Sequence, residues 1–220
     1  MYYKSLKDHV YDYISKSITS GKLKPNEKIN EKEICEDLSV SGTPVREALI
    51  HLETYGYIER IPRKGFYVKE LSLEKVKEKY IVIGALDGLS ASLSLDYITK
   101  KDLKKMEKII EEIDLSVEER NYQKYFKLQI SFHKIYTDKC KNKELISTID
   151  RLKKSFIRKT YIPDGKEDDL YETLHITNLE HKEILKLFIK GNKKDLEDYI
   201  RNSHWSPKYA EHDAFIFDHE

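Results

Sequence analysis

The chain has 220 residues, of which 39% are hydrophobic and 36% charged, and its formal net charge at pH 7 is +1. With only 8 glycines and 5 prolines, the composition favours a helix-rich globular protein over a sheet-rich or disordered one. No stretch of about 18 uncharged apolar residues occurs, and charges are spread over the N-terminal segment, which argues against a membrane span and a signal peptide. We therefore expect a cytoplasmic protein with no membrane partner. The net charge of +1 is not typical of proteins that coat nucleic acid without sequence preference.

Two short helices are predicted at the N-terminus. Apolar residues recur at every fourth position in Leu6–Ile18, and Gly21 ends the pattern, which predicts a helix over about residues 5–20. A second helix is indicated by Asn30 followed three residues later by Glu33, a pattern typical of a capped helix start.

A third helix begins in the stretch Ser41–Leu49, which reads S-G-T-P-V-R-E-A-L. Ser41 and Thr43 can accept free backbone N–H groups at a helix start, and Pro44 is tolerated in a first turn. Arg46 projects from one side near the N-terminus. The opposite side is apolar and is expected to be buried: Val45, Ala48, Leu49 and Leu52.

Two short strands, residues 57–60 and 66–69, are predicted after this helix. The connection between them, 61–65, is basic and contains a glycine. Three helices followed by such a hairpin predict a winged helix-turn-helix, in which the third helix can read the DNA major groove.

Residues 6–69 resemble the DNA-binding domain of the GntR family of bacterial transcription regulators. The usual signature of that family is close to S-R-T-P-V-R-E-A-L, followed by a wing that ends in G-x-x-V, as Gly65–Val68 does here. One departure is Gly42, which stands where the family usually has an arginine that helps to read guanines. We expect that one of two reading arginines is missing.

The resemblance implies a role for each matching residue. Arg46 is expected to reach a guanine edge, and Ser41 and Thr43 to bind phosphates. Arg63, Lys64 and Gly65 are expected to place the wing at or near the minor groove. The alternatives are a surface salt bridge for Arg46 and a solvated turn for the wing tip.

The chain beyond the hairpin is predicted to be an all-helical bundle, so the fold class is mainly α. We expect a winged-helix domain over 1–70, a helical domain over 71–206 and an atypical tail over 207–220. Apolar spacing predicts helices at about 73–96, 100–116, 121–139, 142–161, 167–191 and 193–206. In the tail, Pro207 should end the last helix, and the apolar stretch 214–217 either packs back or joins a partner.

This second half resembles the FCD effector-binding domain of the FadR subfamily. The residues that carry the resemblance include Phe132-His133, Glu180-His181 and His204. In metal-binding members, three such histidines are joined by an aspartate one turn before the first, where this chain has Gln129. Three histidines alone can still hold zinc or nickel with open coordination positions. The alternative for each histidine is ordinary packing.

The resemblance implies a homodimeric regulator, commonly a repressor, that binds a palindromic operator in double-stranded DNA and responds to a small organic-acid effector. Ile83 replaces an arginine that pairs with effector carboxylates in the family, so the effector-binding residues stay unknown. Two other hypotheses remain open. One makes the helical domain a dimerisation scaffold without a ligand, and the other makes the histidines a hydrolytic metal site. Because no acid or base accompanies the histidines in sequence, we do not expect an enzyme.

Overall fold

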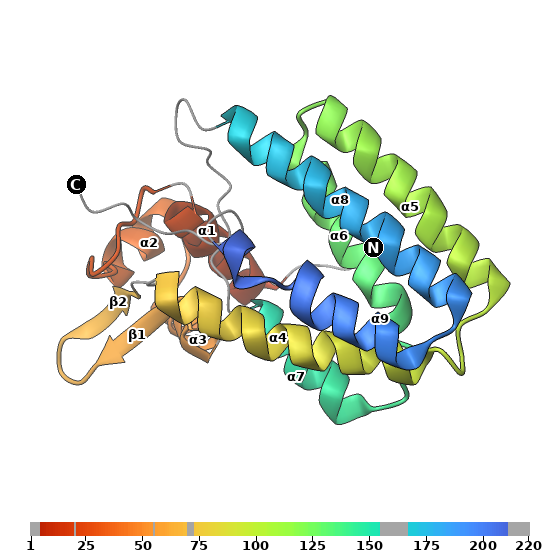
Figure 1. Cartoon of the computed structure of the whole chain (residues 1–220). Coiled ribbons are helices and arrows are strands. Elements are labelled where there is room, and N and C mark those ends of the chain that lie inside the picture. Colours follow the sequence, from red (N-terminus) through yellow and green to blue (C-terminus); the bar gives the residue numbers. More distant parts are fainter. Residues whose placement is uncertain (1–4, 20, 55, 70–72, 155–166, 211–220) are drawn as a thin grey trace. The chain divides into compact units, whose positions relative to one another are not determined.

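The computed structural model describes residues 5–19, 21–54, 56–69, 73–154 and 167–210. Within these ranges the chain is mainly helical, as predicted, and it divides into two compact units (Figure 1). The first unit is formed mainly by residues 1–73, and the second by 74–153 and 162–212.

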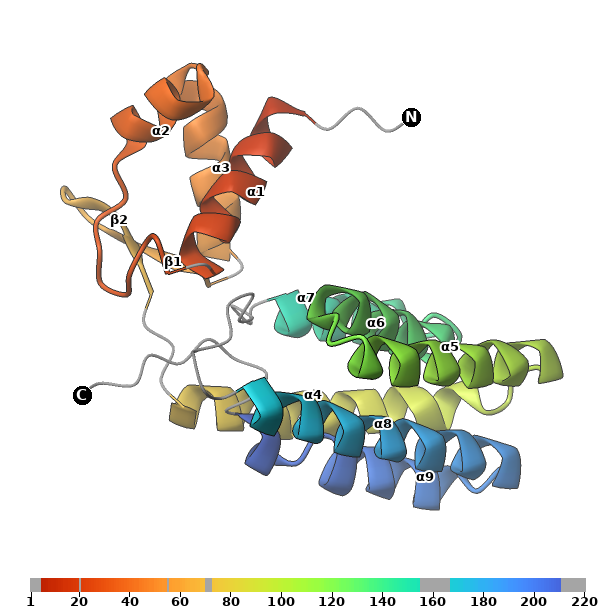
Figure 2. The ribbon, with the colours of Figure 1, turned by 90° about the horizontal axis from the view of Figure 1, so that it is seen from above.

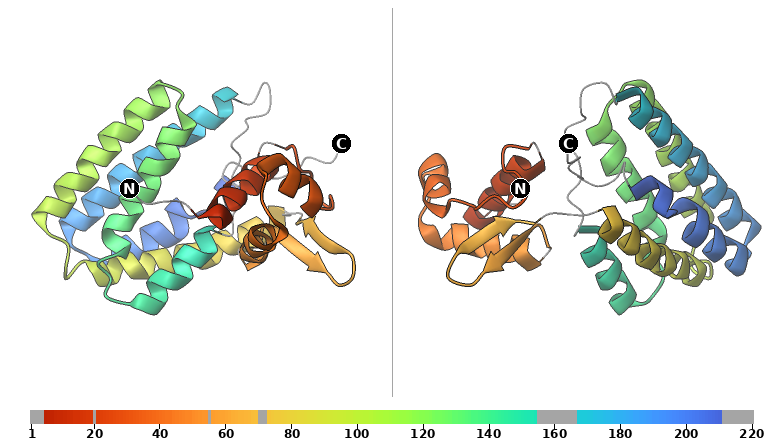
Figure 3. Two further views of the ribbon diagram at one scale, coloured as in Figure 1. Left: turned by 180° about the vertical axis from the view of Figure 1, so that it is seen from behind. Right: turned by 60° about the vertical axis from the view of Figure 1, so that its left-hand side comes forward.

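The first unit has the three predicted helices and the predicted hairpin. Its elements are α1 (Leu6–Thr19), α2 (Glu31–Leu38), α3 (Gly42–Thr54), β1 (Ile58–Ile61) and β2 (Gly65–Val68). The strands pair antiparallel, with Ile58 opposite Val68, and Figure 3 shows the hairpin beside α3. As the sequence indicated, Asn30 caps α2, since its side chain accepts the Glu33 amide at 3.4 Å.

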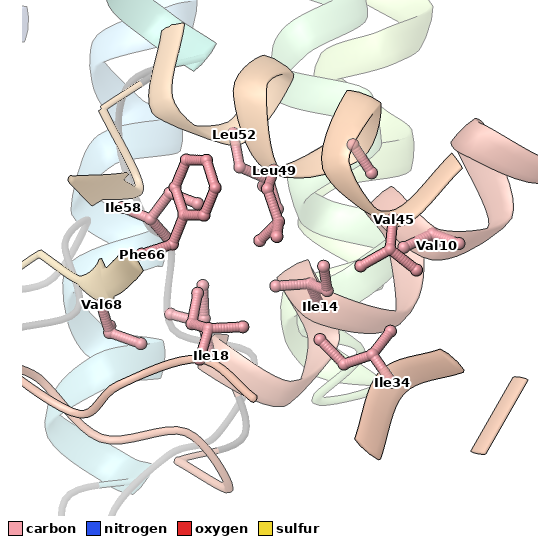
Figure 4. Close-up of a cluster of buried hydrophobic side chains, with 12 residues drawn as sticks. Val10, Ile14, Ile18, Ile34, Val45, Leu49, Leu52, Ile58, Phe66 and Val68 are labelled. Carbon is pink, nitrogen blue, oxygen red and sulfur yellow. The ribbon is translucent and has the colours of Figure 1, made fainter. Parts of the chain in front are cut away.

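One apolar core holds these elements together (Figure 4). The predicted apolar side of α3 is confirmed, because its four residues are fully buried. They pack with the stripe of α1 from Val10 to Ile18, whereas Leu6 at the start of that stripe stays 62% exposed. Burial of one side of α3 leaves Arg46 in solvent.

The second unit is an all-helical bundle. Its helices are α4 (Leu73–Ser94), α5 (Lys100–Glu118), α6 (Tyr122–Thr137), α7 (Lys143–Lys154), α8 (Glu167–Lys190) and α9 (Lys193–Tyr199). Helix α5 packs against α6 and α8, and α8 runs beside α9 (Figure 2). The first three predicted helices and the one over 167–191 agree within a few residues. Residues 155–161, the end of the predicted helix over 142–161, lie outside the described residues.

The chain continues from α9 in a less regular form than the single helix predicted over 193–206. A π-helical turn, η1 (Ile200–His204), follows directly, and a short 3₁₀ helix, η2 (Pro207–Tyr209), comes next. Pro207 is the first residue of η2, where its missing N–H costs little. The last helix therefore ends before Pro207, as expected, but through a π-turn, a feature often found at functional sites.

Two glycines let α4 approach this C-terminal segment closely. A Cβ at Gly84 would lie 2.9 Å from the backbone oxygen of Arg201, and one at Gly88 would lie 2.7 Å from that of Glu197. Only glycine fits at such distances, because backbone atoms on both sides are fixed by their helices. This contact brings Asp87, between the two glycines, beside the C-terminal segment.

Candidate functional site

Three histidines that are far apart in sequence meet inside the second unit. His133 comes from α6, His181 from α8 and His204 from the last residue of η1, and all three are buried. One ring nitrogen of each lies within 4.8 Å of those of the other two. The Nε2 atoms of His133 and His204 are 3.1 Å apart. This cluster could hold a metal ion.

The opposite ring nitrogens of two of these histidines face carboxylates. His133 Nδ1 lies 3.0 Å from Asp87 Oδ2 and 2.5 Å from the Tyr136 hydroxyl, which itself donates to Asp87 at 3.0 Å. His204 Nδ1 lies 3.1 Å from Glu180 Oε2. Because these oxygens accept hydrogen bonds, they favour the tautomer with the proton on Nδ1.

The third histidine is oriented by an amide. His181 Nδ1 lies 3.1 Å from Asn178 Oδ1. The amide nitrogen of Asn178 donates to the Ile110 carbonyl at 3.1 Å and to Asp114 at 2.7 Å. Since that nitrogen is engaged, the oxygen is left to accept the Nδ1 proton of His181.

When each histidine carries its proton on Nδ1, its Nε2 atom has no proton and offers a lone pair. The three Nε2 atoms that converge in the cluster could then each bind a metal ion. Within the part of the chain that the structure describes, His181 Nε2 is a buried polar atom with no hydrogen-bond partner. Two nitrogens bound to a tetrahedral zinc at about 2.1 Å would lie about 3.4 Å apart, close to the 3.1 Å between His133 and His204. The donor set and its outer hydrogen bonds therefore fit a divalent metal.

Burial of His133 and His181 favours their neutral form. Burial lowers the pKa of His133 to about 3, with a further contribution from Lys153, and burial also lowers the pKa of His181 well below 6.5. Burial opposes ionisation of Asp87, but Lys153, 3.3 Å away, and His133 lower the pKa of its carboxyl well below the usual range. Neutral histidine is the form that binds a metal.

Gln129 lies where the resemblance places a metal-binding aspartate. It is buried, one turn before His133 on α6. Asp87, which reaches the cluster from α4, contributes a carboxylate to the outer shell instead.

Sequence reasoning missed the residues that orient the histidines. Asp87 had a usable signal, since it is the only charged residue in the small and apolar stretch 80–94 of α4, and a buried carboxylate is expected to have a partner. Glu180 was noted only as part of a motif. Asn178 precedes His181 by three residues, the spacing at which side chains on one helix meet.

The candidate DNA-reading residues of α3 lie in solvent in the first unit. Ser41, Thr43 and Arg46 are exposed, with Ser41 immediately before the first residue of the helix. Arg46 Nε donates to Glu31 Oε2, the first residue of α2, at 3.1 Å, and its side chain is 74% exposed. An exposed pair of this kind stabilises a protein by at most about 1 kcal/mol, so it leaves the arginine available to another acceptor.

The wing residues form the turn between β1 and β2. Arg63 and Lys64 are exposed at this turn, and the Lys64 amide donates to the Ile61 carbonyl at 3.0 Å. Arg63 has φ +63° and Gly65 has φ +107°. Residues with a side chain rarely adopt a φ of +107°, so the turn needs glycine at position 65. This turn exposes the side chains of Arg63 and Lys64.

Comparisons with known proteins agree with both units. Residues 6–68 match the family described as bacterial regulatory proteins, gntR family, and residues 80–203 match the FCD domain. The chain belongs to the GntR family. As a GntR regulator with an FCD domain it is a DNA-binding transcriptional regulator and not an enzyme. None of its described helices is long and apolar enough to cross a membrane.

Several known transcriptional regulators align along most of the chain. The HTH-type transcriptional regulator YdhC of Bacillus subtilis (strain 168) is 27% identical over 191 residues, which cover 86% of this chain and 84% of YdhC. The HTH-type transcriptional repressor RspR of Escherichia coli (strain K12) is 26% identical over 153 residues, covering 70% and 67%. The solved structure of E. coli McbR/YncC has a TM-score of 0.70 at 20% identity, covering 95% and 97%, and so shares the fold.

Proposed function

We propose that this chain is a homodimeric, ligand-responsive transcriptional repressor with a divalent metal in its FCD domain. One of the similar proteins, RspR of E. coli, is described as a repressor, which supports the repressor part of the proposal. The observation that carries the metal proposal is the convergence of three buried imidazoles whose Nδ1 atoms all face acceptors. The domains proposed are 1–70 for DNA binding and 71–206 for the effector and dimerisation.

In the DNA-bound state, Arg46 would exchange its bond to Glu31 for a guanine edge in the major groove. Ser41 and Thr43 would bind phosphates at the N-terminus of α3, where the helix dipole favours an anion. The exposed cations Arg63 and Lys64 would reach the minor groove from the wing. Because the net charge is only +1, DNA binding would depend on these few cationic side chains and not on a broadly basic surface.

In the effector domain, His133, His181 and His204 would hold zinc or nickel. The bound metal would offer an open coordination position to an oxygen of a small organic acid. Ile83, which replaces the arginine of the resemblance, is fully buried, so it supplies no charge to such a ligand. Ligand binding can change repression only if it favours one arrangement of the DNA-binding domains over another.

The metal is tested by comparing two histidines of the same helix. Zinc added to the metal-free wild type at 100 times its Kd should raise the free energy of unfolding by about 2.7 kcal/mol. His181→Ala should abolish this stabilisation, whereas His175→Ala should not, because His175 is exposed on α8. Elemental analysis and thermal unfolding measure both effects, and a wild type that takes up neither zinc nor nickel would contradict the proposal.

The DNA contact is tested on a duplex selected from a random pool by the wild-type protein. Arg46→Ala should weaken specific binding by about 1–3 kcal/mol and leave binding to unrelated duplex little changed. Arg151→Ala is a matched control, since Arg151 is an exposed arginine on a helix of the other unit. Equal operator affinity of wild type and Arg46→Ala would exclude the base-reading role.

A second candidate keeps the DNA binding but makes the helical unit a scaffold without a ligand. The two observations that favour it are the neutral Gln129 beside His133 and the buried Ile83 on α4. It predicts that operator binding does not change when zinc or a carboxylic acid is added. Gel-shift titration with and without metal separates the two proposals.

A further inference from the structure

The segment after His204 lies beyond the stretch that matches the FCD domain, yet it is built into the surroundings of the histidine cluster. Trp205 is buried, and its ring lies edge-on to Tyr80 with 5.2 Å between ring centroids. Its Cβ also fills the space over Gly84, where an added methyl group would come within 2.8 Å. The position of Trp205 is therefore fixed by close packing against α4.

Two side chains of this segment donate hydrogen bonds to the two outer carboxylates. Trp205 Nε1 donates to Asp87 Oδ2 at 2.7 Å, and the Tyr209 hydroxyl donates to Glu180 Oε1 at 2.7 Å. Asp87 faces His133 and Glu180 faces His204, as described above. Each carboxylate thus joins one histidine to one residue of the C-terminal segment.

The same segment also sets the position of His204 through the backbone. The Trp205 amide donates to the Ile200 carbonyl at 3.1 Å and closes the π-turn whose last residue is His204. If Trp205 were displaced, two groups would lose their fixed positions: His204, and Asp87, whose carboxylate faces His133.

We infer that Trp205 and Tyr209 are positioning residues of the metal centre: they hold Asp87 and Glu180 in the orientations that keep the Nε2 atoms of His133 and His204 free and convergent. The inference rests on the metal site proposed above. Outer partners of metal-bound histidines fix the tautomer and the ring orientation, and their loss typically weakens metal binding by about 10- to 100-fold.

The fluorescence of Trp205 can report metal binding at this centre. Trp205 is the single tryptophan of the sequence, and its ring lies 6.0 Å from the rings of both His133 and His204. Cobalt(II), which has unpaired electrons, should quench the emission of Trp205 on binding, whereas zinc should not. Quenching therefore measures occupancy of this site in the wild type and in variants that keep the tryptophan.

The test uses two mild variants of the full chain. Tyr209→Phe and Trp205→Phe each remove one donor and keep an aromatic ring. Tyr171→Phe is the control, because it removes a hydroxyl that donates to the Arg120 carbonyl and not to the cluster. Affinities for cobalt(II) and zinc are measured by titration calorimetry in all variants, together with the cobalt absorption spectrum and the unfolding temperature of the metal-free protein.

We expect both variants to bind cobalt(II) and zinc about 10- to 100-fold more weakly than wild type and to show altered cobalt absorption bands, with the control unchanged. A purely structural role would lower the unfolding temperature of the metal-free chain and leave the cobalt spectrum unchanged, which would overturn the inference. Wild-type affinity and spectrum in both variants would overturn it as well. A wild type that binds neither ion would instead remove the metal site on which the inference rests.

Discussion

Three residues that depart from the family pattern, Gly42, Ile83 and Gln129, lie in surroundings that the structure describes. Gly42 is the first residue of α3, and a Cβ there would meet nothing within 4 Å, so the missing arginine reflects no steric limit. Ile83 is packed in the core of its unit, where an arginine would need a buried partner. Gln129 keeps the burial of the expected aspartate but removes its charge.

Gln129 allows a direct test of the distance between α6 and the metal position. Gln129→Asp should tighten zinc binding by roughly 10- to 100-fold, because a carboxylate adds a charged ligand to three neutral ones. The same change should destabilise the metal-free protein, since a buried carboxylate loses its hydration. Calorimetric titration and thermal unfolding measure the two effects. Gln123→Asp, exposed on the same helix, is the control, and equal zinc affinity in both would show that position 129 does not reach the metal.

At the scale of the helix, local capping defines where α5 begins. Thr99 and Asp102 form a reciprocal capping box in which each side chain accepts the other residue's amide hydrogen. Lys139 pairs with the same Asp102 carboxylate at 2.7 Å and ties the start of α5 to the segment after α6. Burial acts to raise the pKa of Asp102, but hydrogen bonds from Lys139 and Thr99 outweigh it and lower the pKa to about 2.

Asp102→Ala should therefore cost about 1 kcal/mol of unfolding free energy at pH 7. The folded-state pKa lies below the usual aspartate pKa of 3.8, so this stabilisation is present above that pH and is lost as the pH falls towards 2. Urea unfolding at pH 7 and pH 3 should show the cost shrinking. Asp96→Ala, which removes only an exposed pair with Lys193, is the control and should cost less; an equal cost would contradict the role of the cap.

At the scale of the molecule, one side of α4 provides a surface suited to a second copy of the chain. The side of α4 that carries Gly84 and Asp87 is buried, whereas Val82, Leu89 and Leu93 are exposed at spacings of seven and four residues, which places them on one helical face. A row of exposed apolar side chains of this kind is a common feature of interaction surfaces. A two-fold dimer would match a palindromic operator.

The double variant Val82→Glu/Leu89→Glu should convert the proposed dimer into a monomer, because two charges would be buried at the proposed interface. Light scattering after gel filtration measures the mass, and operator affinity should fall with the loss of one half-site contact. The control double variant is Leu115→Glu/Ile189→Glu, which changes exposed apolar residues of α5 and α8. A dimer that survives the α4 changes, or a monomeric wild type, would exclude this interface.

The sequence by itself determined the family, the helices, the hairpin and the buried side of α3. These features follow from local rules, since helical periodicity, caps and turn residues act within a few positions of one another. The same local rules predicted one helix through residue 206, and they did not reveal the π-turn, in which Arg201 lies close to Gly84 from a distant part of the chain.

Only the tertiary structure decided what surrounds the histidines. The sequence suggested His133, His181 and His204 through a family resemblance, but their convergence depends on the packing of α6, α8 and η1. Asp87 and Trp205 are separated by more than half of the chain and meet because two glycines let helices touch. Hydrogen bonds between such distant residues leave no periodic pattern in a single sequence, so the outer shell of the site became visible only in the folded molecule.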